Sequence, residues 1–87
     1  MPYSILDVQP TPNPNAMKFC LDRPVVDQPK SFFNADAAGD HPLAARLFRI
    51  PGVSSLLLLG DFITVNKQPD VKWSEITSAV KRVLSND

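Results

Sequence analysis

The sequence predicts a small α+β domain, in which a mainly antiparallel sheet has two helices packed on one face. Three observations support this fold class. The candidate elements follow the order strand, strand, short strand, helix, hairpin, helix, which is typical of an antiparallel sheet with added helices. Two runs of β-forming residues flank the pair Gly60–Asp61, as in a hairpin. Apolar residues recur at helical spacing near the end of the chain.

The first two expected strands lie on either side of a proline-rich segment. Tyr3–Val8 (YSILDV) is the first, bounded by the prolines that follow it. Ala16–Leu21 (AMKFCL) is the second, and its side chains alternate as they do in a strand with one buried face. The residues expected on one face are Met17, Phe19 and Leu21, and those on the other are Ala16, Lys18 and Cys20.

A loop and a short helix are expected in the middle of the chain. Pro24 and Pro29 bracket the loop, and Lys30–Phe33 (KSFF) is expected to form a short edge strand. Asp40 is the candidate N-cap of the helix, and Pro42 falls in its first turn, where a missing N–H costs nothing. The apolar positions repeat at helical spacing and stop at a Pro-Gly pair; they are Leu43, Ala44, Leu47, Phe48 and Ile50.

A hairpin and a second helix complete the chain. Gly60–Asp61 suits a two-residue turn, because glycine takes a positive φ without a Cβ clash. The run Leu56–Leu59 points to both faces of the preceding strand, which favours burial on both faces over an exposed patch. Lys72–Leu84 is expected to be a helix with one apolar stripe, formed by Trp73, Ile76, Val80, Val83 and Leu84.

The charge balance and the single cysteine limit the classes of partner and compartment. Nine Lys and Arg residues offset nine Asp and Glu residues, so nothing favours nucleic acid or an anionic membrane. The longest apolar run is too short to cross a bilayer, and the first ten residues lack a signal-peptide pattern. Cys20 has no partner for an internal disulfide, which fits a reducing compartment. We therefore expect a cytoplasmic protein.

Few residues suit catalysis or metal binding. His41 is the only histidine and Cys20 the only cysteine, and no local motif places them together as base and nucleophile. We expect Cys20 to pack as a small apolar residue and His41 to be a solvated residue at a helix start. Zinc and iron–sulfur sites usually take four Cys or His ligands, often as CxxC. The sequence therefore predicts no enzyme, no metal site and no cofactor bound by this chain alone.

The segment TPNPN, Thr11–Asn15, is expected to be a rigid, polyproline-like arm. Each proline fixes its own φ and biases the preceding residue toward extended backbone, and the two asparagines can bond nearby backbone. Two roles stay open. The arm can fix the angle between the first two strands. Alternatively, it can be a docking surface for a partner protein, because a stiff segment loses little entropy on binding. The docking hypothesis involves Thr11, Pro12, Asn13, Pro14, Asn15 and Lys18.

Several motifs, in order along the chain, resemble one family. TPNPNAMKF (Thr11–Phe19) resembles the N-terminal domain of Nfu-type (NifU-like) iron–sulfur scaffold proteins. HPLAARLFRIPGVSSLLLLGDFITVNK is similar to the family's Pro-Leu-Ala, Leu-Phe, Gly-Val and Asp-Phe-Ile-Thr-Val segments, and Trp73 matches as well. The resemblance runs from Thr11 to the end of the chain. It implies a compact α+β domain with a place in iron–sulfur cluster biogenesis.

The resemblance also implies what the chain holds and what it lacks. We expect a single Nfu-N-like domain over residues 1–87, without the separate C-terminal CxxC domain that carries the cluster in full-length scaffolds. The expected function is a non-enzymatic accessory module of cluster assembly or delivery. It would dock an iron–sulfur carrier, a chaperone or an apo-target, and the cluster would lie on the partner. One alternative is a homodimer that binds iron or a cluster through Cys20, and another is a small enzyme or regulator that reuses the fold.

Overall fold

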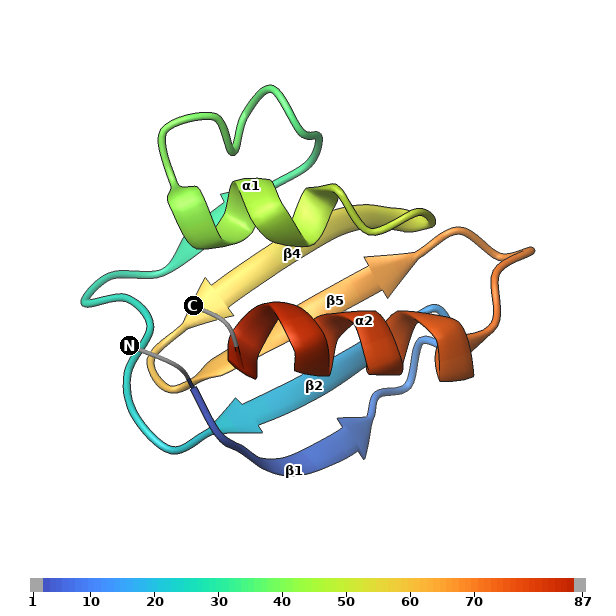
Figure 1. The fold of residues 1–87 in the computed structure, drawn as a ribbon, viewed down its shortest axis with the longest axis horizontal. Helices are drawn as coiled ribbons and strands as arrows, with labels where there is room; N and C mark the ends of the chain where they lie inside the picture. Colours follow the sequence, from blue (N-terminus) through green and yellow to red (C-terminus); the bar gives the residue numbers. More distant parts are fainter. Residues whose placement is uncertain (1–2, 86–87) are drawn as a thin grey trace.

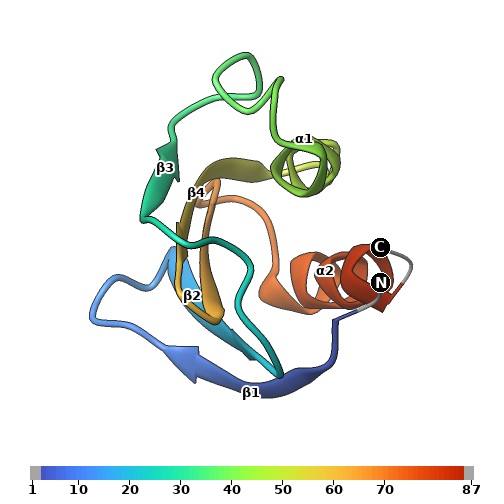
Figure 2. The same cartoon turned by 90° about the vertical axis from the view of Figure 1, so that its left-hand side faces the viewer.

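A five-stranded antiparallel sheet and two helices make up residues 3–85, the part of the chain that the computed structural model describes (Figure 1). The elements are β1 (Ile5–Pro10), β2 (Ala16–Leu21), β3 (Lys30–Phe32), α1 (Pro42–Phe48), β4 (Val53–Leu59), β5 (Phe62–Lys67) and α2 (Trp73–Ser85). The strand order across the sheet is β1-β2-β5-β4-β3. Seen along the strands, both helices lie on the same face of the sheet (Figure 2). The predicted fold class is therefore confirmed.

The core lies between the helices and the face of the sheet that they cover. Phe19 and Leu21 of β2 are buried there, as the alternation predicted, and Met17 packs against them from a half-buried position. The other large side chains that are fully buried are Leu47, Leu56, Leu58, Ile63, Val65, Ile76, Val80 and Leu84. Burial of one such side chain stabilises a fold by about 1.5–3 kcal/mol. Ala16 is also buried, although it was expected on the other face.

The first strand begins and ends two residues later than predicted. β1 covers Ile5–Pro10 and pairs only with β2, so it is an edge strand. A proline is tolerated on an edge strand because its missing N–H can face away from the sheet. Pro10, opposite Met17, therefore ends the strand rather than preventing it.

The N-cap of α1 is His41, so the prediction of Asp40 is wrong. His41 has extended backbone, with φ −115 and ψ 104, and its Nδ1 accepts a hydrogen bond from the Ala44 N–H at 3.2 Å. The reason is Pro42 at the first helical position. A residue that precedes proline is disfavoured in helical backbone, so His41 must be the last non-helical residue.

The leucine run is buried on one face only, which contradicts the prediction of burial on both. Leu56 and Leu58 are buried, whereas Leu57 is half-buried and Leu59 is 37% exposed. Because α1 and α2 lie on the same side, nothing in residues 3–85 packs as a layer over the other side of the sheet (Figure 2). We call that side the open face.

The hairpin prediction is confirmed. Leu59 pairs with Phe62, so the turn consists of Gly60–Asp61. Gly60 has a φ of +57, and positive φ at the first of the two central residues suits glycine.

A second glycine joins α1 to β4 and also requires positive φ. Gly52 has a φ of +97 and follows Pro51, where the helix was predicted to stop. Its carbonyl accepts a hydrogen bond from the Gln68 N–H at 2.7 Å, so the connections before β4 and after β5 are tied together.

None of the helices in residues 3–85 is both long and apolar enough for a membrane crossing.

Candidate functional site

The arm Thr11–Asn15 is folded on itself at the end of the sheet, between β1 and β2 and near the start of α2 (Figure 1). It consists of bends and a turn, so the prediction of a polyproline-like conformation is wrong. The Thr11 hydroxyl lies 2.9 Å from the Asn13 carbonyl oxygen and accepts the Asn13 N–H at 3.1 Å. The Asn13 side-chain oxygen accepts the Asn15 N–H at 2.9 Å. These bonds agree with the expectation that the polar residues of the arm stiffen its own backbone.

Two residues far along the chain hold the arm in place. The Trp73 indole N–H donates to the Pro14 carbonyl at 2.9 Å. Lys67 is buried, and its ammonium donates to the Asn15 side-chain oxygen at 3.2 Å and to the Gln68 carbonyl at 3.3 Å. The Lys67 backbone N–H donates to the Asn15 carbonyl at 2.8 Å. The arm is thus anchored to the end of β5 and to the start of α2, while its expected role in fixing the angle between the first two strands stays a prediction.

The outward side of the arm remains a candidate docking surface. Pro12, Asn13 and Pro14 are exposed, while Thr11 and Asn15 are half-buried. The Asn13 and Asn15 side chains are already engaged within the molecule, so the two proline rings are the main groups that face solvent. A partner at this surface would meet rigid apolar rings.

Lys18 lies on the open face rather than against the arm. Its ammonium is 4.2 Å from the centre of the Phe62 ring. Phe62 pairs with Cys20 next to the β4–β5 turn, so the Lys18 side chain points toward the turn and away from the arm. The candidate docking residues therefore occupy two places: the arm at one end of the sheet, and Lys18 on the open face.

The two residues considered for catalysis lie on different sides of the sheet. Cys20 is half-buried and alternates with the buried Phe19 and Leu21, which places it on the open face. His41 caps α1 on the helix-covered side and its ring contacts Phe32 at 5.7 Å between centroids. The fold does not form a Cys–His pair. Among residues 3–85, no group of three or more His, Cys, Asp or Glu is arranged to hold a metal ion.

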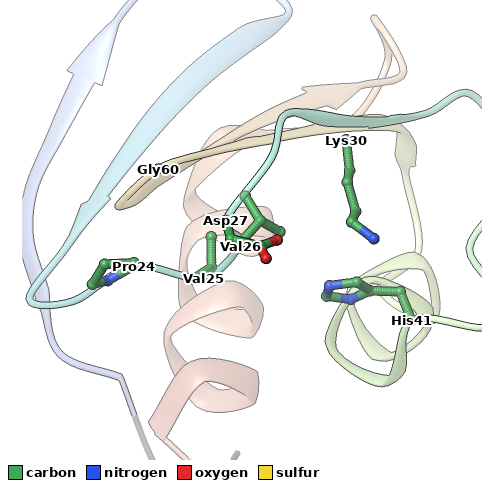
Figure 3. Close-up of a pocket in the computed structure, with 7 residues that line it drawn as sticks. All are labelled: Pro24, Val25, Val26, Asp27, Lys30, His41 and Gly60. Carbon is green, nitrogen blue, oxygen red and sulfur yellow. The ribbon is translucent and has the colours of Figure 1, made fainter.

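His41 also lines a cavity of about 680 Å³ beside β3 (Figure 3). Its walls come from three segments. The loop before β3 and the first residue of β3 supply Pro24, Val25, Val26, Asp27 and Lys30, the start of α1 supplies His41, and the hairpin turn supplies Gly60. The Val25 N–H donates to the Gly60 carbonyl at 2.9 Å and so holds the loop after β2 against the hairpin turn. Lys30 and His41 point toward each other across the cavity (Figure 3). Sequence reasoning missed this cavity because no local motif joins these segments.

The charge state of His41 follows from its contacts. Burial lowers the pKa of His41 below its ordinary value of 6.5, and the Lys30 ammonium lowers it further. The accepting Nδ1 has no proton, so the neutral ring carries its proton on Nε2. His41 is thus a neutral helix cap whose Nε2–H is the donor left for the cavity. It was expected to be a solvated residue and is half-buried instead.

Substitution of His41 should change both the stability and its pH dependence. His41→Ala removes the cap and is expected to lower the free energy of unfolding by about 1 kcal/mol at pH 8. In the native chain the folded pKa lies below 6.5, so the unfolded state binds the proton first as the pH falls. Stability should therefore decline below pH 6.5 and level off below the folded pKa.

His41→Asn is the matched control, because asparagine caps a helix without titrating in this range. Urea unfolding between pH 5 and 8 gives the free energy of unfolding of the native chain, His41→Ala and His41→Asn. If the native chain and His41→Asn have the same pH profile, His41 does not act as the neutral cap described here.

The chain matches a family profile over nearly its whole length. The profile described as "Scaffold protein Nfu/NifU N terminal" matches residues 5–87. The human protein "NFU1 iron-sulfur cluster scaffold homolog, mitochondrial" is 42% identical over 74 residues, which is 83% of this chain and 29% of the human protein. The chain thus spans less than a third of that relative's length.

Solved structures show the same fold. The crystal structure of protein SAV1430 from Staphylococcus aureus has a TM-score of 0.78 at 26% identity, over 92% of this chain and 96% of that one. The solution structure of a NifU-like protein from Saccharomyces cerevisiae has a TM-score of 0.81 at 28% identity, over 98% of this chain and 77% of that one.

Proposed function

Because the chain belongs to the Nfu/NifU N-terminal domain family, we propose that it is a non-enzymatic accessory module of iron–sulfur cluster assembly or delivery. The observation that carries this proposal is the family match over residues 5–87. The human relative is named as an iron–sulfur cluster scaffold homolog, which supports the same pathway. With a single cysteine, the chain has no CxxC pair, so the cluster would lie on a partner.

The proposed mechanism is protein–protein docking. The partner would be an iron–sulfur carrier, a chaperone or an apo-target protein. It would contact the arm Thr11–Asn15 and, on the adjoining open face, Lys18. The arm supports this role because its backbone is already fixed by Trp73 and Lys67, so little further entropy is lost when it binds.

The test is anaerobic affinity capture of the tagged protein from its own cells. The docking variant is Pro12→Glu/Pro14→Glu, because both rings are exposed and the Pro14 carbonyl that bonds Trp73 is kept. The matched control is Pro29→Glu/Pro69→Glu, which adds the same charge at two other exposed prolines. Equal melting temperatures of the three proteins show that the fold is retained.

We expect the native chain and the control to recover iron–sulfur carriers or apo-enzymes, and the arm variant to lose them. Equal recovery by the arm variant would leave the pathway in place and exclude the arm as the contact. Absence of cluster-assembly proteins from every capture would contradict the proposed function itself.

Direct binding of iron or a cluster by a homodimer remains the second candidate. It is favoured by one observation, the half-buried free Cys20 on the open face. Two chains supply two thiolates, whereas a cluster usually takes four cysteine ligands, so external thiols would have to complete the site. We expect that anaerobic reconstitution gives no visible absorption band that depends on Cys20. The native chain and Cys20→Ser should therefore have the same visible spectrum. A band that depends on Cys20 would favour the homodimer.

A further inference from the structure

Three of the four arginines in the chain line one cavity between the helices. α1 and α2 run side by side in opposite directions on the covered face of the sheet (Figure 1). Between them is an open cavity of about 350 Å³. Arg46 and Arg49 reach it from the end of α1, and Arg82 reaches it from the second half of α2.

The cavity is lined by apolar residues together with the three arginines. Its apolar lining residues are Ile50, Pro51, Ala79 and Val83. None of the described lining residues is acidic. Arg49 and Arg82 are exposed, and Arg46 is half-buried in the wall. The total charges of the chain balance, so the three arginines are a local concentration of positive charge around this cavity.

Helix electrostatics alone does not account for the arrangement. Arg46 and Arg82 each lie in the last turn of their helix, where a cation offsets the helix dipole. Dipole compensation requires a cation at a helix end, but it does not require arginines from two helices to line the same cavity. Arginine rather than lysine at all three positions favours planar, two-pronged recognition of a carboxylate.

We propose that this cavity docks an acidic segment of a partner protein. One apolar side chain of that segment enters the cavity, and carboxylates on either side of it bind Arg49 and Arg82. The cavity is open to solvent, so it covers one or two side chains and does not enclose a metabolite, which usually loses most of its surface on binding. The inference does not rest on the proposed function, because the arm contacts the opposite end of α2, at Trp73.

The test is selection of a random 12-residue peptide library, displayed on phage, against the full chain. The arginine variant is Arg49→Gln/Arg82→Gln. The control is Lys72→Gln/Lys81→Gln, which removes the same charge from two exposed lysines, one just before α2 and one within it, that do not line the cavity. We expect the enriched peptides to pair Glu or Asp with a large apolar residue. They should bind the arginine variant at least about ten-fold more weakly, and the control within about two-fold.

Amide chemical shifts in the native chain locate the peptide. The expected shifts lie at Ile50, Ala79 and Val83, and substitution of the peptide's apolar residue by serine should weaken binding as well. Several results would overturn the proposal: no enrichment of acidic peptides, equal loss of binding in both variants, or shifts confined to the arm. It would also fail if inorganic phosphate or acetate bound with the affinity of the peptide, because the cavity would then be a simple anion site.

Discussion

Gly52→Ala is expected to lower the free energy of unfolding by about 2–5 kcal/mol, the sum of backbone strain and overpacking. Gly52 has a φ of +97, which a residue with a Cβ rarely adopts. A Cβ at this position would lie 2.8 Å from both methyl carbons of Val71, closer than Cβ atoms approach other carbon atoms in real structures. The 2.7 Å bond from the Gln68 N–H to the Gly52 carbonyl prevents the two connections from moving apart without a further loss.

Gly60→Ala is the matched control for this prediction. Gly60 also has positive φ, at +57, but a Cβ there would have none of the described atoms within 4 Å. Its cost should be the strain alone, about 1–2 kcal/mol. Urea unfolding measures both variants. Because Val71 supplies the clash, Gly52→Ala/Val71→Ala should recover part of the loss; equal costs for the two glycines would mean that the contact with Val71 is not limiting.

A second large effect is expected for Asn15→Ala, which should lower the free energy of unfolding by about 1.5–3 kcal/mol. The Asn15 side-chain oxygen accepts a hydrogen bond from the ammonium of Lys67, a residue that is only 8% exposed. Without Asn15, a buried charge keeps the Gln68 carbonyl and the face of the Trp73 ring, 5.7 Å away, as its remaining contacts. A buried charge that loses one partner is costly because water cannot replace the lost bond.

The double variant Asn15→Ala/Lys67→Met separates the pair from its surroundings. Methionine keeps an apolar stem of similar length and removes the charge. The double variant should be less destabilised than the sum of the two single variants, by about 0.5–3 kcal/mol. Strict additivity in urea unfolding would show that Lys67 does not depend on Asn15. The same result bears on docking experiments: substitutions of Asn15 report on stability, so the exposed prolines are the better probes.

Local patterns in the sequence were sufficient for most of the fold. The alternation of Met17, Phe19 and Leu21 identified the buried face of β2, and Gly60–Asp61 identified the hairpin, because both signals depend on neighbouring residues only. The N-cap of α1 could also have been predicted from the sequence. Pro42 disfavours helical backbone at His41, and this restriction outweighs the general preference for aspartate at an N-cap.

The candidate sites could not be predicted from the sequence, because they depend on contacts between distant segments. The open face could not be predicted from the run Leu56–Leu59. The exposure of that face depends on the packing of both helices on the same side of the sheet. Lys67 at a strand end is typical of the surface, yet the arm and Trp73 cover it. Arg49 and Arg82 are ordinary solvated residues until α1 and α2 are placed side by side.

The bond between Trp73 and Pro14 has a consequence for the nascent chain. It joins residues 59 positions apart, and β2 needs β5 as its neighbour, so Thr11–Asn15 is not held in place until Trp73 has been synthesised. Contacts of such long range form slowly, because the entropy of closing the intervening loop is lost before the contact stabilises the fold. A truncated or unfinished chain would leave Thr11–Asn15 unfixed. A partner that recognises the rigid arm would thereby select molecules whose folding is complete.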